Sequence, residues 1–407
     1  MSSQPTEPSR LPSLTGMRFA AAFLVFLCHS FVLGFYHPET EAALRPYAFA
    51  IGWLGVEFFF VLSGFVLTWS VREGQPARRF WRRRLAKVYP NHVVTWFAAL
   101  ALALWAGQTL DLFKLLPSLF LVHTWYPRLD VILSLNVVTW SLACDLLFYL
   151  AFPLLYALVR RVPARRLWWV AAGIVAVVML LPAVAQAWLA GEPKLPGQDM
   201  TLTQNWLLVS FPPVRALDFT LGIVMARIVR TGGWIRFGPV PALALLVLGF
   251  AVQVSQFPGV YSLTAPIVAP LALLIPAVAT ADVRGGFSPF RGRVLQWLGA
   301  VSYASYLVHF LVLVHGHTVL GAGRTWDAVP ATALLAALFA VTTLLAWALY
   351  RLVEEPGMRR WGRPKPLPAP HAVPLPAPLP APHAVPPPTA AADGRTPAAP
   401  TAPAASD

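Results

Sequence analysis

Long apolar segments alternate with short polar loops over most of the chain. Ten of these segments contain 18 to 24 residues, the length that an α-helix needs to cross the hydrocarbon core of a bilayer. Because backbone groups in lipid must be satisfied within their own segment, the pattern predicts an all-α polytopic membrane helical bundle. The predicted transmembrane helices lie at roughly residues 14–35, 50–71, 89–107, 136–159, 167–190, 205–228, 239–256, 261–281, 294–316 and 329–352.

Positive charges gather in every second loop. Of the 31 Lys and Arg residues, 25 lie near the N-terminus, in alternate loops and after the last apolar segment. Loops rich in Lys and Arg stay on the cytoplasmic side of a membrane, so both termini are predicted to be cytoplasmic. The intervening loops hold Arg45, Lys114, Arg128, Lys194 and Arg324, and Arg215 lies inside an apolar segment.

The composition supports a membrane protein and argues against a nucleic-acid-binding one. The 407 residues are 57% hydrophobic and 12% charged, whereas soluble domains contain about 25% charged residues. The net charge of +14 comes from loops beside apolar segments, where basic side chains meet anionic lipid headgroups. The sequence contains no zinc-ligand spacing and no nucleic-acid-binding motif. Cys28 and Cys144 lie in apolar segments and are expected to be packed free thiols.

The two ends of the chain differ from the membrane domain predicted at residues 14–360. Residues 1–13 are polar and lack a cleavable signal pattern, which indicates a cytoplasmic N-terminal segment. Residues 361–407 are rich in Pro and Ala, and the sequence LPAPHAVP occurs there twice. Such a segment cannot bury a core, so we predict a disordered cytoplasmic tail.

The first apolar segment contains two ionisable residues, Arg18 and His29. At ~100° per residue, eleven positions make almost three turns, so both side chains share one helix face, separated by ~16 Å of rise. Ionisable groups inside a membrane are costly and mark functional sites by default. The alternative is an Arg that extends to the interface and a His that hydrogen-bonds a neighbouring helix.

Two polar residues, Glu57 and Ser63, lie in the second apolar segment. Glu57 is either a solvated acid at the membrane interface or part of a polar cavity. Ser63 and Gly64 form a small pair that favours close packing of helices over direct chemistry.

The loop before the third apolar segment reads RRFWRRRLAKVYP and includes Arg83, Arg84, Lys87 and Tyr89. Membrane topology and contact with lipid headgroups explain most of this positive charge. The functional alternative is a phosphate site, since Arg binds phosphate in a bidentate manner and a cytosolic donor such as coenzyme A carries several phosphates.

The fourth segment places Asp145 one helical turn before Tyr149, with Trp140 nearby. A carboxylate at this depth should pair with a cation, orient a His or carry a proton. The two aromatic residues are more often packing than chemistry.

Two later segments also carry polar groups. In the sixth, Arg215 and Asp218 follow a Pro-Pro pair at a spacing that allows them to neutralise each other. In the ninth, Tyr303, Tyr306 and His309 recur every three residues, which predicts one face lined by hydroxyl and imidazole groups.

Five stretches together resemble the acyltransferase 3 family of integral membrane O-acyltransferases. They are LPSLTGMRFAAAFLVFLCH, FFFVLSGFVL, RRRLAKVYP, WSLACDLLFYLAFP and LGAVSYASYLVH, in family order between Leu11 and Pro356. Two positions depart from the family pattern: Lys87 stands where the family often has Arg, and Asp145 where it usually has Glu.

The resemblance implies transfer of an acyl group, commonly acetyl, from cytosolic acyl-CoA to a hydroxyl, without a cofactor or a metal. Family acceptors include surface glycans, sugars and macrolide-type metabolites, and the expected location is a bacterial plasma membrane. His29 would be the general base, Arg18 would bind donor phosphate or stabilise negative charge, and Asp145 would orient His29.

The residues expected to bind substrate are Glu57, Ser63, Arg83, Arg84, Lys87, Tyr89, Trp140, Tyr149, Tyr303, Tyr306 and His309. A different class of function, a secondary transporter or flippase, also places ionisable residues in the membrane. The half-repeats common in transporters are not evident in this sequence.

Overall fold

The computed structural model describes residues 11–71, 74–191, 193–195, 199–257, 259–321 and 323–361, and these are helical throughout apart from their connecting loops. This agrees with the predicted all-α bundle. The predicted tail at residues 361–407 lies outside the described residues except for Trp361, and most of the predicted N-terminal segment lies outside them as well.

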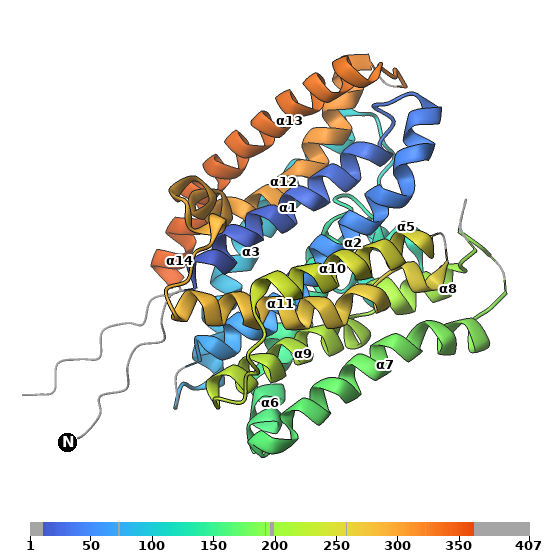
Figure 1. Cartoon of the computed structure of the whole chain (residues 1–407). Coiled ribbons are helices and arrows are strands. Elements are labelled where there is room, and N and C mark those ends of the chain that lie inside the picture. The colour runs from blue at the N-terminus through green and yellow to red at the C-terminus, as the bar shows by residue number, and fades with distance from the viewer. Residues whose placement is uncertain are drawn as a thin grey trace, which may run out of the picture. The chain divides into compact units, whose positions relative to one another are not determined.

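Nine helical stretches within the described residues are long and apolar enough to cross a membrane. Figure 1 shows their arrangement. Their main helices are α1 (Pro12–Val32), α2 (Pro38–Trp69), α3 (Ala77–Trp105), α6 (Thr139–Arg161), α7 (Leu167–Trp188), α9 (Pro212–Arg230), α11 (Ala265–Val283), α12 (Arg293–Gly321) and α13 (Ala328–Leu349).

The seventh predicted span, at residues 239–256, corresponds to α10 (Pro239–Ser255), which has 17 residues. A helix of this length rises about 25 Å, less than the ~30 Å of a bilayer core. It lies beside α11 (Figure 1), and Gln253 near its end donates a hydrogen bond of 2.5 Å to the carbonyl of Leu263 just before α11. The two helices are therefore antiparallel.

Short helices connect the long ones. They are α4 (Leu112–Leu119), α5 (Leu129–Ile132) and α8 (Leu202–Asn205), and a further short helix, α14 (Glu355–Trp361), follows the last long one. A shorter apolar run, residues 112–125, begins with α4, whose residues Leu112, Phe113 and Leu116 are exposed. A helix with one exposed apolar side suits an interfacial position.

The sixth predicted span is broken where the sequence has its Pro-Pro pair. One turn of π-helix (Trp206–Ser210) ends at Phe211, whose backbone is extended, and α9 then begins with Pro212 at its first position. Proline lacks the N–H that a helix interior needs but fits a helix start, which explains the break.

The core of the bundle is formed where α2 packs against α9 and where α1 packs against both α2 and α12. Gly64 of α2 lies against the carbonyl of Phe219, and Gly222 of α9 lies against the carbonyl of Val61. The absence of a side chain at both glycines lets the two backbones approach closely.

The first turn of α1 is held by Asp282 at the end of α11. Its carboxylate accepts hydrogen bonds from the backbone N–H (2.8 Å) and hydroxyl (2.5 Å) of Ser13, and it pairs with Arg291 at 2.8 Å. A carboxylate at a helix N-terminus satisfies free N–H groups and favours the helix dipole. Asp282 thereby fixes the start of the helix that carries Arg18 and His29.

Candidate active site

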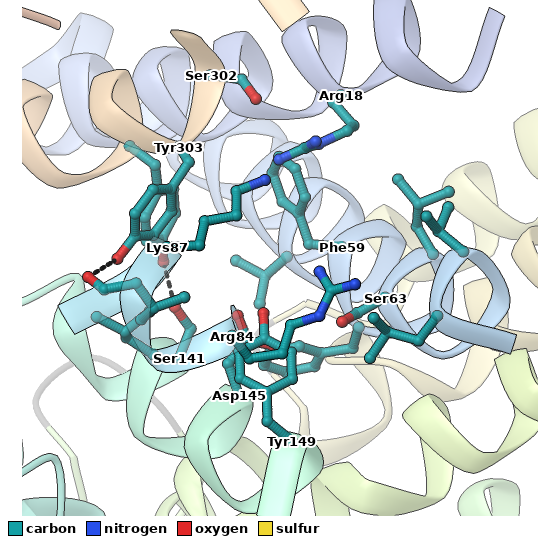
Figure 2. A pocket seen from close by; sticks show the side chains of 18 residues that line it. Arg18, Phe59, Ser63, Arg84, Lys87, Ser141, Asp145, Tyr149, Ser302 and Tyr303 are labelled. Carbon is teal, nitrogen blue, oxygen red and sulfur yellow. Dashed lines mark hydrogen bonds between the residues drawn. The ribbon is translucent and has the colours of Figure 1, made fainter. Parts of the chain in front are cut away.

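A cavity of about 140 Å³ lies between α1, α2, α3, α6 and α12. Figure 2 shows charged and hydroxyl side chains from all five helices directed into it. Its lining residues are Arg18, Val56, Phe59, Phe60, Leu62, Ser63, Val66, Leu67, Arg84, Lys87, Val88, Ser141, Leu142, Asp145, Tyr149, Ser302, Tyr303 and Tyr306.

Three cations share this cavity with one carboxylate. Arg18 comes from α1, Arg84 and Lys87 come from one face of α3, and Asp145 of α6 interacts electrostatically with all three. The Nε atom of Arg84 is buried and has no hydrogen-bond partner. An excess of cations with an unpartnered guanidinium nitrogen is an environment that attracts an anionic ligand.

Hydroxyl groups line the remaining polar wall. Tyr306 and Ser141 hydrogen-bond each other at 2.7 Å across α12 and α6, and the Tyr303 hydroxyl donates to the carbonyl of Val88 at 2.9 Å. Ser63 and Tyr149 face the same space. Because Ser63 lines the cavity while Gly64 packs on α9, the small pair in α2 serves the packing and the cavity wall at once.

A second pocket of about 220 Å³, here called the vestibule, adjoins the cavity. It lies where α2 ends, α3 begins and α6 ends, and its polar lining includes Ser70, Arg83, Arg84 and Arg160. Arg84 and Leu67 line both spaces. The vestibule thus extends the positively charged site toward one end of the bundle.

His29 and His309 form a pair outside the lining of the cavity. Nδ1 of His29 on α1 lies 3.0 Å from Nε2 of His309 on α12, and Nδ1 of His309 lies 2.7 Å from the backbone carbonyl of Tyr306. His309 is 2% exposed. Tyr306 lines the cavity, and His309 follows it by three residues. About 4.5 Å of rise along α12 therefore separates His309 from the cavity wall.

Comparison with known proteins assigns the chain to a family. The acyltransferase 3 family model, described as an acyltransferase domain, matches residues 11–351. The chain belongs to this family. It is 42% identical to "Acyltransferase MdmB" of Streptomyces mycarofaciens over 89% of this chain and 95% of that protein.

Two further relatives of this chain are more distant. "Exopolysaccharide production protein ExoZ" of Rhizobium meliloti is 30% identical over 77% of this chain and 91% of its own length. "Peptidoglycan O-acetyltransferase OatA" of Listeria monocytogenes is 23% identical over 85% of this chain and 55% of its own length. No solved structure was found to match.

Membership of the acyltransferase 3 family decides between the two predicted classes of function. The protein is an acyltransferase and a multi-pass membrane protein, so the transporter alternative is set aside. Within the described residues, no group of three or more His, Cys, Asp or Glu side chains is arranged to hold a metal ion.

Five of the residues predicted to bind substrate lie outside the cavity lining: His309, described above, and four others. Glu57 is 1% exposed and pairs with Arg215 at 3.3 Å, and Arg215 also pairs with Asp218 at 3.1 Å. Arg83 lines the vestibule instead. The Tyr89 hydroxyl donates to the carbonyl of Leu119, and Trp140 packs on the rings of Trp53 and Phe60.

Sequence reasoning missed three residues at this acyltransferase site. Ser141 and Ser302 line the cavity, and Glu354 is buried at the end of the last long helix. Glu354 accepts a hydrogen bond of 2.8 Å from Asn91 and interacts with Arg18 and Lys87. The available signal was a Glu-Glu pair directly after an apolar segment, but the pattern alone does not distinguish the buried Glu354 from the less buried Glu355.

Proposed function

We propose that the protein transfers an acyl group, acetyl in the simplest case, from cytosolic acyl-CoA to a hydroxyl of a sugar, a cell-surface glycan or a macrolide-type metabolite. The observation that carries the proposal is the cavity with three cations, one carboxylate and a hydroxyl-lined wall, inside a member of an acyltransferase family. The relatives named for exopolysaccharide production and for peptidoglycan O-acetylation support a hydroxyl acceptor.

The anionic donor would enter through the vestibule. Arg83, Arg84 and Arg160 line that pocket, and a guanidinium binds phosphate oxygens through two parallel hydrogen bonds. The Arg84 side chain also lines the cavity, together with Arg18 and Lys87. In this arrangement the phosphates stay among the arginines of α3 and α6, and the thioester end reaches deeper into the bundle.

The size of the cavity favours a short acyl group. Its apolar walls, which include Val56, Phe59, Phe60 and Leu142, enclose about 140 Å³. A pocket of fixed shape discriminates against each extra methylene by about 1–3 kcal/mol. We therefore expect acetyl to be transferred faster than longer chains.

His29 is the proposed general base, acting where the acceptor meets the thioester. The acceptor oxygen bonds to the thioester carbonyl carbon while its proton passes to His29. The adduct then breaks its carbon–sulfur bond, and the coenzyme A thiolate leaves with the proton from His29. Arg18 would bind the donor phosphates together with Arg84 and Lys87, because ~16 Å of helix rise separates it from His29. The contact between the rings of His309 and Tyr306 supports this role, because Tyr306 belongs to the cavity wall.

Replacement of His29 tests the assignment of the base. In purified protein in nanodiscs, His29→Ala should lower acyl-CoA-dependent acylation of a hydroxyl acceptor by about 10²–10⁴-fold, since a positioned base contributes that much. His315→Ala, on the same helix as His309 but two turns further from the cavity, is the matched control and should keep full activity. Thiol release and mass spectrometry of the acceptor measure the rate. Full activity of His29→Ala would refute the proposed base.

A further inference from the structure

We infer that His309 is a positioning residue, which holds the His29 ring in the one tautomer that can accept a proton from the acceptor. This inference rests on the proposed role of His29 as the base. It does not make His309 a group that touches substrate, and so it replaces the substrate-binding role predicted for His309 from the sequence.

The proton of the His309 ring lies on Nδ1. Its Nδ1 lies 2.7 Å from the backbone carbonyl oxygen of Tyr306. A carbonyl oxygen only accepts hydrogen bonds, so Nδ1 of His309 must carry the proton and donate it. In a neutral imidazole the other nitrogen then has the lone pair, which leaves Nε2 of His309 as an acceptor.

The neutral state follows from the surroundings of the two rings. His309 is buried between α1 and α12, where it contacts the rings of Phe26 and Tyr306, and His29 contacts the ring of Phe310. A buried charge needs a partner of opposite sign or a polar cavity. Among the described residues no carboxylate interacts with either ring, so both imidazoles are neutral at rest.

The acceptor nitrogen of His309 in turn fixes the position of the proton on His29. Its Nδ1 lies 3.0 Å from Nε2 of His309, and that nitrogen can only accept. Nδ1 of His29 must therefore carry the proton, and the lone pair of His29 lies on Nε2. The carbonyl of Tyr306 thus favours, through His309, Nε2 of His29 as the base, and the backbone of Val25, one turn earlier in α1, also hydrogen-bonds the His29 ring.

The same chain of hydrogen bonds is inconsistent with a His29 ring that has its proton on Nε2 and its lone pair on Nδ1. Both nitrogens of His309 are engaged, one with Tyr306 and the other with His29. His29 keeps a nitrogen that this chain does not use. When His29 has taken a proton, its Nδ1–H becomes a charge-assisted donor to His309, and such bonds are stronger than neutral ones.

Two substitutions at His309 separate positioning from packing. His309→Gln keeps a side-chain oxygen that accepts from Nδ1 of His29, whereas His309→Leu has a similar bulk and no acceptor. We expect kcat to fall about 10²-fold in His309→Leu and to stay within about fivefold of the wild type in His309→Gln. KM for acetyl-CoA should be unchanged in both, because Arg18, Arg84 and Lys87 are untouched. Loss of tautomer control in a serine protease triad costs even more, about 10⁴-fold.

Nitrogen chemical shifts measure the tautomer directly. In wild-type protein labelled with ¹⁵N-histidine, the His29 signals, assigned by their loss in His29→Gln, should show a protonated Nδ1 and an unprotonated Nε2. In His309→Leu the Nε2-protonated form should become populated. A role of His309 in packing alone would leave the His29 tautomer unchanged, and the wild-type measurement stands even where His309→Leu fails to fold.

The outcomes distinguish this inference from the proposed function. If His29→Ala is inactive but the wild-type His29 carries its proton on Nε2, or if folded His309→Leu keeps the wild-type kcat, the inference is overturned and the base assignment stands. If His29→Ala is fully active, the proposed base is wrong, and the inference fails with it.

Discussion

Arg84 is the residue that connects the two spaces of the candidate site. It lines the cavity and the vestibule, its Nε atom lacks a partner, and its guanidinium carbon lies 5.5 Å from the centre of the Phe80 ring. The ring of Phe80 restricts the planar group without using its N–H donors. A guanidinium held in this way is prepared to bind an anion.

We predict that Arg84→Gln raises KM for acetyl-CoA at least tenfold and that Arg84→Lys restores only part of the loss, because Lys keeps the charge but lacks the planar fork. Arg79→Gln is the control, since Arg79 lies on the same helix but is exposed and lines neither space. Steady-state kinetics with varied acetyl-CoA measure both. An equal effect of the two Gln substitutions would mean that α3 attracts the donor only through its overall charge.

The sequence predicted several of the individual residues at the site but not their partners. Periodicity placed Arg18 and His29 on one face of α1, and in the structure Arg18 lines the cavity while His29 faces His309 of α12. Asp145, which was expected to orient His29, lies among the three cations instead. Helical spacing defines which side chains share a face, but the neighbouring helix that meets this face depends on the tertiary packing.

The two buried glutamates illustrate the same limit. Glu57 stands out in the sequence because it interrupts an apolar segment, yet Arg215 of α9 pairs with it. Glu354 attracts less attention at the end of a segment, yet it interacts with Arg18 and Lys87. Both acids are 1% exposed, so burial alone does not separate a structural ion pair from a residue near the site.

At the level of the helices, the contact between α2 and α9 holds one wall of the cavity in place. Gly64 and Gly222 each lie against a backbone carbonyl of the opposite helix, and Ser63, next to Gly64, lines the cavity. A side chain at either glycine would meet backbone atoms, which cannot rotate away. Any increase in the separation of these helices therefore also moves Ser63.

We predict that Gly222→Ala destabilises the protein by about 1–3 kcal/mol, the usual cost of an extra group in a tightly packed core. Gly173→Ala is the matched control, because a Cβ at Gly173 in α7 would meet nothing within 4 Å. The control should be as stable as the wild type or slightly more so, since Ala favours helix over Gly. Thermal denaturation of the solubilised protein reports both, and equal midpoints would contradict the close approach of α2 and α9.

The positions of helices were easier to predict than their number. Each of the ten predicted spans corresponds to a helical stretch, since lipid requires long apolar runs. Only α10 is shorter than the length expected of a membrane span. It packs antiparallel to α11, which ends beside the start of α1.

At the level of the whole membrane domain, the basic loops meet at one end of the bundle. Arg230 near the end of α9 donates to the carbonyl of Thr68 near the end of α2, and Arg227 donates to the carbonyl of Arg160 in α6. The vestibule lies between the same helix ends. The opposite end is held by the backbone bond from Trp326 to Phe35. The alternation of charge along the sequence thus corresponds to two distinct ends of the folded domain.

We predict that the end with the vestibule faces the cytoplasm, where acyl-CoA is found. In a Cys28→Ala, Cys144→Ala background, Arg165→Cys between α6 and α7 should react with an impermeant maleimide only after the cells are opened. Gln108→Cys after α3 should react in intact cells, because it lies at the other end of a helix that begins beside the vestibule. Both positions are exposed, so access depends on the side of the membrane and not on burial.

Acyltransferase activity of each variant serves as the control for folding in this labelling experiment. The reverse pattern would put the arginines of the vestibule outside the cell, where acyl-CoA is absent, and would contradict both the orientation and the proposed route of the donor. Labelling of both positions in intact cells would mean that the end of α6 and the end of α3 do not lie on opposite sides of the membrane. If Gln108→Cys reacts in intact cells and Arg165→Cys does not, the charge distribution, the vestibule and the donor route all agree. The Lys and Arg residues then lie on the side of the membrane that supplies the anion they bind.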